Sequence, residues 1–159
     1  MTRPSLFHST VRPEWIDYNG HMSEAFYVLV FGHATDALMI ETGLDSGYRE
    51  STGCSLYTVE SHIRFLRDVP DGSHLAVRTR VLGAAARKAR FVHEMYVVSV
   101  PESEPTPDAA PVATTELLAV HVDRQAGRAA EFPDAVRRRF TELTEPAPEW
   151  AGRSIGAVA

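Results

Sequence analysis

Residues 15–23 (WIDYNGHMS) carry the side chains of this sequence best suited to chemistry. A carboxylate (Asp17), an amide (Asn19) and an imidazole (His21) follow one another closely, just before an expected helix start. The first N–H groups of a helix are unpaired and partly positive, so they can hold a developing oxyanion. A carboxylate beside them can act as a nucleophile or as a general base on water. The segment predicts attack on an activated carbonyl; alternatively, Asp17 and Asn19 only shape a turn and His21 packs against the helix.

A helix expected over residues 23–42 would position this segment. Ser23 can accept a hydrogen bond from a first-turn N–H, and Gly43 suits the left-handed residue after a helix. The first half, residues 25–31 (AFYVLVF), is apolar nearly all round, whereas a surface helix carries only an apolar stripe. The pattern therefore predicts a central helix of about 30 Å that other elements wrap.

Five strand-like segments surround this helix in the sequence, at residues 5–12, 56–66, 74–82, 88–100 and 112–122. The second of them alternates between two faces. One face carries Tyr57, Val59, Ile63 and Phe65, and the other carries Thr58, Glu60, His62 and Arg64. Short turns between successive strands are typical of an antiparallel sheet, so the sequence predicts an α+β fold. A long central helix wrapped by a five-stranded antiparallel sheet is the hotdog arrangement, whose exposed edge and polar second face favour dimerisation.

The remaining segments fit one domain over residues 1–159, as expected for a chain of this length. Residues 101–111 form an acidic, proline-rich connection that we expect to be exposed. Residues 134–143 predict a short helix, and residues 145–159 form a C-terminal tail rich in proline and glycine.

Composition excludes several classes of protein. The formal net charge of −5 argues against a nucleic-acid partner. The longest apolar run, residues 25–31, is far shorter than the ~20 residues of a membrane helix. The first residues lack the apolar core of a signal peptide. Cys54 is the only cysteine, which excludes an intrachain disulfide and fits a reducing compartment, so we expect a cytoplasmic location.

Motifs of other hydrolases and of metal sites are weak. The sequence has no G-x-S-x-G elbow, no phosphate-binding glycine pattern and no H-E-x-x-H pair. His62, His93 and His121 lie on three separate strand segments without the spacing of a metal site, so we expect hydrogen-bonded histidines and no metal.

Three segments carry a family resemblance: residues 17–27 (DYNGHMSEAFY), 55–66 (SLYTVESHIRFL) and 72–82 (GSHLAVRTRVL). They resemble the 4-hydroxybenzoyl-CoA thioesterase-like hotdog superfamily. Within it, EWIDYNGHM, AFYVLVFGHATDA and the tail segment WAGRSIG are similar to the betainyl-CoA thioesterases, including those fused to L-carnitine dehydrogenase. The likeness covers residues 5–155 and implies an acyl-CoA thioesterase.

The resemblance also implies residue roles. The Asp that opens the family's D-x-x-G motif falls on Asp17, as nucleophile or base, and the backbone oxyanion donor falls near Glu24. Many relatives read H-M-N-N-x-x-Y, whereas this chain has Ser23-Glu24 and keeps Tyr27. Asn19 and His21 are candidates to orient water or the thioester oxygen.

The resemblance implies an active site shared between two subunits of a homodimer or homotetramer. Glu60 would then be a second carboxylate, and His62 would line the cleft. A betainyl group ends in a quaternary ammonium, which aromatic rings can hold. Trp15, Tyr18 and Tyr27 are the candidates.

Further candidates complete the expected site. Trp150 could join the aromatic rings, with Asp36 or Glu41 as a charge partner for the ammonium. The CoA phosphates predict a basic cluster, for which residues 87–90, with Arg87, Lys88 and Arg90, are the best candidate and residues 137–139 a rival.

Other functions stay open at this stage. Acyl-ACP or broad acyl-CoA hydrolysis would need a long apolar cleft, and a non-catalytic acyl-CoA-binding protein would bind without releasing thiol. Hydrolysis itself needs no cofactor besides the CoA of the substrate.

Overall fold

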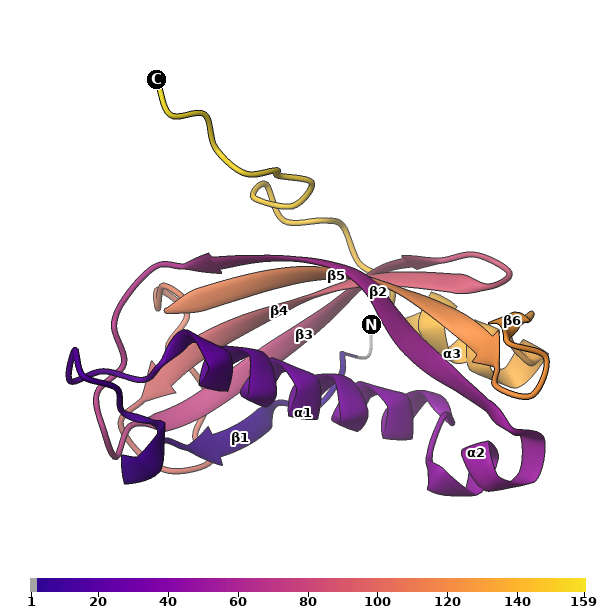
Figure 1. Ribbon diagram of the computed structural model, residues 1–159, viewed down its shortest axis with the longest axis horizontal. Coiled ribbons are helices and arrows are strands. Elements are labelled where there is room, and N and C mark those ends of the chain that lie inside the picture. The colour runs from indigo at the N-terminus through magenta and orange to yellow at the C-terminus, as the bar shows by residue number, and fades with distance from the viewer. Residues whose placement is uncertain (1–2) are drawn as a thin grey trace.

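The computed structural model describes residues 3–159 and forms one antiparallel sheet with a long helix against it (Figure 1). The helices are η1 (Pro13–Trp15), α1 (Glu24–Thr42), α2 (Ser46–Thr52) and α3 (Asp134–Leu143). The strands are β1 (Phe7–Thr10), β2 (Cys54–Phe65), β3 (His74–Ala84), β4 (Lys88–Val98), β5 (Ala113–Asp123) and β6 (Arg128–Ala129). The sheet order is β1-β3-β4-β5-β2, with short β6 paired to β5. The predicted α+β hotdog fold is confirmed; α2 and β6 were not predicted.

The core lies between α1 and the inner face of the sheet. Towards the start of α1, Tyr27 and Phe31 pack with Val77 and Met95. Towards its end, Leu38 packs with residues of the sheet and of α3, including Phe140. Burying large apolar side chains of this kind stabilises a fold by about 1.5–3 kcal/mol each. The two clusters fix α1 along the sheet and so fix where its first residue stands.

A buried histidine connects the middle of α1 to the sheet. His93 on β4 has no solvent exposure, and its Nε2 and Nδ1 lie 2.8 Å from the hydroxyls of Thr35 and Thr79. The Thr35 hydroxyl donates to the carbonyl of Phe31, so Nε2–H donates to Thr35 and the Thr79 hydroxyl donates to Nδ1. Burial lowers the pKa of His93 to about 3. The imidazole is therefore a neutral structural link.

The ends of α1 agree only in part with their predicted caps. Gly43 takes the predicted left-handed conformation, with φ of 94°. Ser23 is the N-terminal cap by backbone geometry, but the predicted side-chain hydrogen bond is absent. Its carbonyl instead accepts from Phe26 N–H at 3.0 Å. The prediction for the Ser23 side chain was therefore wrong, because the backbone already closes the first turn.

One flank of α1 is open, although the sequence predicted a wrapped helix. Val28 and Ile40 are 50% and 65% exposed, and the neighbouring edge strand β2 exposes Val59 at 57%. Strand β2 is an edge strand of the sheet that residues 3–159 form. Within one chain, the sheet covers only part of the apolar surface of α1.

A bulge in β2 changes the predicted faces of that strand. Thr58 pairs with Ala119 and Glu60 with Leu118, which leaves Val59 as an extra residue. A one-residue shift exchanges the two faces. Thr58 therefore lies on the inner side with Ile63, and Tyr57 on the outer side with Glu60. The predicted faces of Tyr57 and Thr58 were wrong because the sequence pattern contained no sign of the bulge.

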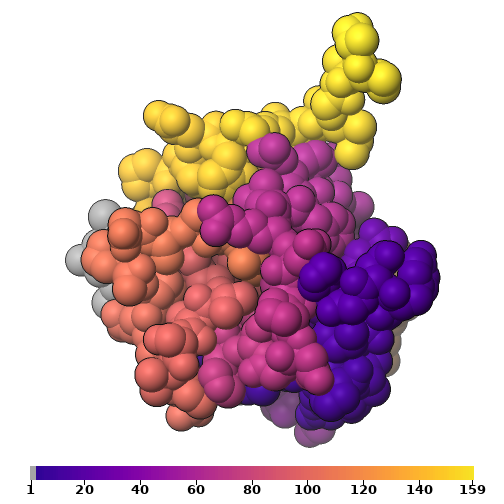
Figure 2. Space-filling view, turned by 90° about the vertical axis from the view of Figure 1, so that its left-hand side faces the viewer, coloured from indigo at the N-terminus to yellow at the C-terminus, as the bar shows by residue number. Residues whose placement is uncertain are grey.

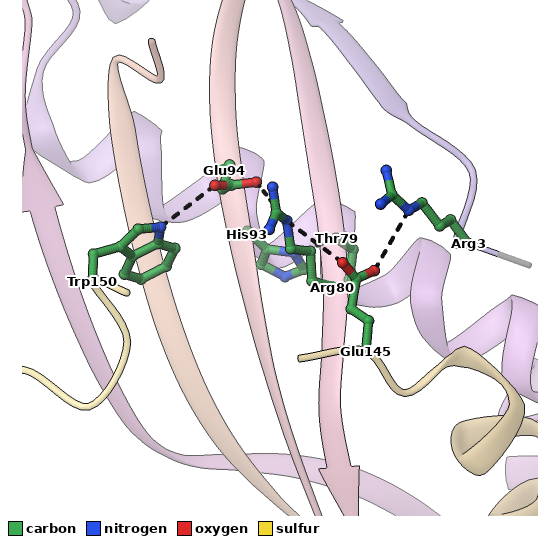
Figure 3. A network of polar contacts seen from close by, with 7 residues as sticks. All are labelled: Arg3, Thr79, Arg80, His93, Glu94, Glu145 and Trp150. Carbon is green, nitrogen blue, oxygen red and sulfur yellow. Dashed lines mark hydrogen bonds and ion pairs between the residues drawn. The ribbon is translucent and has the colours of Figure 1, made fainter. Parts of the chain in front are cut away.

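The C-terminal tail crosses the outer face of the sheet, away from α1 (Figure 1). Glu145 lies 3.8 Å from Arg3 and 3.9 Å from Arg80, and Arg80 pairs with the buried Glu94 at 2.9 Å (Figure 3). The Trp150 indole N–H donates to Glu94 at 3.4 Å. These contacts fasten the first part of the tail to β3 and β4. No helix of the described chain is long and apolar enough to span a membrane.

Candidate active site

The segment before α1 is a tight loop held by its own backbone. Asp17 N–H donates to the carbonyl of His21 at 3.0 Å, and Gly20 N–H donates to the carbonyl of Asp17 at 3.0 Å. Gly20 has φ of 81°, a conformation that glycine adopts without strain. The Asn-Gly turn predicted from the sequence thus folds the chain back so that His21 leads directly into the helix.

Two contacts anchor this loop to the rest of the chain. Met22 N–H donates to the carbonyl of Val69 at 2.8 Å, which ties the loop to the β2–β3 connection. The buried Trp15 ring stacks on Phe26 of α1, with 5.3 Å between ring centroids and 11° between planes. Figure 2 shows the loop before α1 (indigo) beside the β2–β3 connection (magenta) at one end of the molecule.

A hollow of about 350 Å³ lies between these two segments. Its lining residues are Asp17, Asn19, His21, Met22, Glu24, Tyr27, Phe65, Leu66, Arg67 and Asp68. Five predicted site residues therefore meet at one place: Asp17, Asn19, His21, Glu24 and Tyr27.

One of the two carboxylate oxygens of Asp17 is hydrogen-bonded within the loop. Its Oδ1 accepts a 2.8 Å hydrogen bond from Asn19 N–H, which is the turn-shaping contact of the structural alternative. Its Oδ2 accepts no hydrogen bond from any residue within 3–159. The turn orients Asp17, which lines the hollow, and uses only one of its two oxygens, so the structural and chemical interpretations are compatible.

The start of α1 supplies hydrogen-bond donors at the same hollow. The backbone N–H groups of Glu24 and Ala25 have no acceptor among residues 3–159, as expected for the first turn of a helix. The positive end of the helix dipole adds to their attraction for an anion. Because Glu24 and Asp17 line the same hollow, a thioester carbonyl placed there would meet both a carboxylate and these donors.

Tyr27 and Phe65 form the aromatic part of the hollow. Their rings make an edge-to-face pair with 5.1 Å between centroids. Tyr27 is buried, and its hydroxyl donates to the carbonyl of Arg67 at 3.3 Å. Burial raises the pKa of the Tyr27 hydroxyl, and the carboxylates of Asp68 and Asp17 raise it further. Tyr27 is therefore a neutral phenol in a negative local field.

Sequence reasoning missed half of this lining. Phe65, Arg67 and Asp68 come from the end of β2 and the β2–β3 connection, some 40 residues after Tyr27. The sequence marked that connection only as a turn. Pairing of β2 with β5 rather than with its sequence neighbour brings its end back to the helix start, and no local pattern predicts this.

The other predicted substrate residues lie away from the hollow. Trp15 stands behind the loop in the core, and Tyr18 is 97% exposed at the loop tip. Glu60 and His62 line a second hollow of about 240 Å³ on the outer side of β2, together with Arg90. Within one chain, Glu60 and His62 do not meet Asp17.

The predicted basic cluster lies at the far end of the sheet. Arg87 and Lys88 sit at the β3–β4 turn, about 30 Å along β3 from the hollow. Arg87 pairs with Glu131 at 3.9 Å, and Arg90 is held by Glu116 at 2.6 Å. These residues cannot reach a ligand at Asp17 of the same chain, so their predicted role depends on a second subunit.

The three strand histidines also lie apart. His93 and His121 face the core, and both ring nitrogens of each are within hydrogen-bonding distance of a partner. His62 lies on the opposite face. Within residues 3–159 no group of three or more metal-ligating side chains occurs.

The fold and the site together define a class of protein. The "Thioesterase-like superfamily" matches residues 11–140 of this chain, a range that contains the loop, α1 and the entire sheet except β1. The chain belongs to this superfamily and is a thioester hydrolase with the hotdog fold. The resemblance predicted from residues 17–27, 55–66 and 72–82 is confirmed.

Two named relatives and one solved structure are similar to this chain over nearly its whole length. The betainyl-CoA thioesterase of Pseudomonas aeruginosa is 39% identical over 157 residues, which cover 96% of this chain and 94% of that protein. The L-carnitine dehydrogenase/betainyl-CoA thioesterase of Agrobacterium fabrum is 41% identical over 96% of this chain and 30% of that longer protein. In structure, a hypothetical protein from Staphylococcus aureus in complex with CoA has a TM-score of 0.83 at 20% identity, covering 99% of this chain and 98% of the other.

Proposed function

We propose that this chain hydrolyses betainyl-CoA to the free acid and CoA, with Asp17 acting at the thioester carbonyl. The observation that carries the proposal is the hollow that Asp17, with its second carboxylate oxygen unbonded within residues 3–159, lines together with the first residue of α1, whose N–H has no acceptor there. Two relatives that are 39% and 41% identical over 96% of this chain are named for betainyl-CoA. A structural neighbour that holds CoA supports acyl-CoA as the substrate class.

The chemistry follows from the two sides of the hollow. The N–H groups of Glu24 and Ala25 hold the carbonyl oxygen as it gains negative charge. As a base, Asp17 Oδ2 takes a proton from water while the water oxygen attacks the carbonyl carbon. The tetrahedral intermediate then expels the CoA thiolate. As a nucleophile, Oδ2 itself attacks and displaces CoA, and water hydrolyses the resulting anhydride.

Asn19 and His21 serve orientation in either route. The Asn19 N–H fixes Oδ1, so that Oδ2 keeps its direction. The His21 side chain is partly exposed on the hollow wall and is placed to orient water or the thioester oxygen. Both routes consume only water and the thioester, so the proposal invokes no cofactor.

The working unit of the proposal is a homo-oligomer. Val28 and Ile40 of α1 and Val59 of the edge strand β2 are exposed apolar residues. A second copy would cover this apolar surface and pair the free edge. It would also offer Glu60, His62 and the residues 87–90 a route to the site of its neighbour. A cytoplasmic location stays a prediction.

A thiol-release assay tests the proposal. Purified protein is offered betainyl-CoA, acetyl-CoA, a long-chain acyl-CoA and an acyl-ACP, and free thiol is followed with time. We expect the highest kcat/KM for betainyl-CoA. Preference for the long-chain thioester or for the acyl-ACP would replace the substrate assignment, and binding of every thioester without thiol release would contradict the proposal.

A further inference from the structure

The side chains that line the hollow beside Asp17 are mostly negatively charged. Three carboxylates line it, from Asp17, Glu24 and Asp68, against the single guanidinium of Arg67. Asp17 is used by the proposed chemistry. Glu24 is the first residue of α1, where the helix dipole already compensates a negative charge. Asp68 is the carboxylate that neither the fold nor the reaction explains.

The surroundings of Asp68 leave its charge free for a ligand. Its side chain is 77% exposed, and the cation-forming group that approaches it is the His21 imidazole, with Nδ1 3.7 Å from Oδ2. The Tyr27 hydroxyl donates a hydrogen bond to the carbonyl of Arg67, the residue before Asp68, and so lies in the electric field of the Asp68 carboxylate. The influence of Asp68 on the pKa of Tyr27 agrees with this placement. Asp68 therefore lines the hollow together with Tyr27 and Phe65 and acts electrostatically on Tyr27.

The aromatic pair gives this position a second feature that favours a cation. Phe65 lines the hollow with 46% of its surface exposed, and the buried Tyr27 ring packs edge-to-face against it. Aromatic faces attract ammonium groups, and a quaternary ammonium makes no hydrogen bonds. A ring with a nearby carboxylate, rather than a set of hydrogen-bond acceptors, is the arrangement that such a group needs.

The carboxylates predicted from the sequence for this role lie elsewhere. Asp36 is three turns along α1 from Glu24 and does not line the hollow. Glu41, near the end of the helix, accepts a 2.8 Å hydrogen bond from Ser5 N–H. Of the three carboxylates within residues 3–159 that line the hollow, Asp68 neither begins the helix nor acts in the proposed reaction, and its ion-pair contact is with His21.

From this geometry we infer that Asp68 determines substrate specificity: it selects a thioester whose acyl group ends in a quaternary ammonium, held between its carboxylate and the Phe65 and Tyr27 rings. This inference rests on the proposed thioesterase function and adds to it the residue that recognises charge. Asp68 touches the acyl terminus and takes no part in bond making. One carboxylate at this exposure contributes about a tenfold preference for the cation.

The test compares two thioesters of one shape. Betainyl-CoA carries a trimethylammonium group, and tert-butylacetyl-CoA is its neutral isostere with carbon in place of nitrogen. The wild-type protein is expected to show at least a tenfold higher kcat/KM for betainyl-CoA. Asp68→Asn should lower kcat/KM for betainyl-CoA about tenfold, mainly through KM, and leave tert-butylacetyl-CoA within about twofold.

A matched control comes from the same connection. Asp71 is exposed, lies three residues after Asp68 and does not line the hollow. Asp71→Asn removes the same charge from the protein and should leave kcat/KM for both thioesters unchanged. This comparison separates local recognition from long-range attraction. Thermal unfolding of both variants should match the wild type, because neither carboxylate makes an ion pair with Lys or Arg within residues 3–159.

Each other outcome has a definite meaning. If Asp68→Asn slows both thioesters equally, or neither, the inference is overturned while the proposed function stands. If Asp71→Asn reproduces the Asp68→Asn effect, general electrostatics replaces local recognition and the inference is again overturned. If the wild-type protein cleaves neither thioester, the proposed function fails and this inference fails with it.

Discussion

Acid should destabilise this protein through His93 before it protonates most carboxylates. In the folded chain the pKa of His93 is about 3, because burial excludes the imidazolium. In the unfolded chain its pKa is about 6.5. Between these values the unfolded state binds the additional proton, so the free energy of unfolding falls as the pH falls. The stability from neutral His93 is fully present above about pH 6.5 and decreases continuously below it.

The size of the effect follows from the two pKa values. Each pH unit between them costs about 1.4 kcal/mol, so lowering the pH from 7.5 to 5 removes about 2 kcal/mol from this one group. The neutral imidazole that gives rise to this loss links Thr35, in the middle of α1, to Thr79 on β3. At pH 5 the folded protein should therefore keep its structure near α1 but unfold at a lower denaturant concentration, because the extra proton binds only the unfolded chain.

Denaturant unfolding at both pH values, at one protein concentration, measures this loss. His93→Gln keeps a hydrogen-bonding side chain but cannot titrate, and it serves as the comparison. The wild-type free energy of unfolding should fall by about 2 kcal/mol more than that of His93→Gln between pH 7.5 and 5. Parallel pH profiles for the two proteins would refute the reasoning that a buried neutral imidazole links α1 to the sheet.

Two further predictions concern the second subunit. Ile40→Asp places a charge on the open flank of α1 and should convert the homo-oligomer to monomers, as measured by light scattering. Val97→Asp changes an exposed residue of β4 away from that flank and should leave the oligomer intact. Equal behaviour of the two variants would contradict an interface at α1 and β2. Replacing Arg87 and Lys88 together by Gln should raise KM for betainyl-CoA about tenfold. The KM for betainyl-pantetheine should not change, since only CoA carries the nucleotide phosphates. An equal rise of KM for both substrates would show that these residues do not bind the CoA phosphates.

The predictable part of the fold lies where local pattern and tertiary role agree. The apolar run of residues 25–31 identified the helix that the sheet packs on, and Gly43 marked its end. All four long strands were expected close to where they lie, and alternation was the sign for residues 56–66 and 74–82. Strand β4 buries residues on both of its faces, so alternation could not mark it. The bulge at Val59 left no such pattern, since one extra residue changes faces without changing composition.

The same distinction applies to the site. Asp17, Asn19 and His21 stand close in sequence before a helix start, so their meeting in one hollow could be predicted. Asp68 and Phe65 reach that hollow because β2 occupies the sheet edge beside β5, and an order of strands cannot be derived from their individual patterns. The part that sequence missed therefore came from long-range topology.

The most direct test of the central claim is kcat for betainyl-CoA in Asp17→Asn. Asparagine keeps the side-chain oxygen that accepts from Asn19 N–H, so the loop retains its turn while the negative Oδ2 is lost. We predict a loss of at least about 10³-fold in kcat with an unchanged unfolding midpoint. Wild-type turnover in this folded variant would contradict the assignment of Asp17 to the reaction.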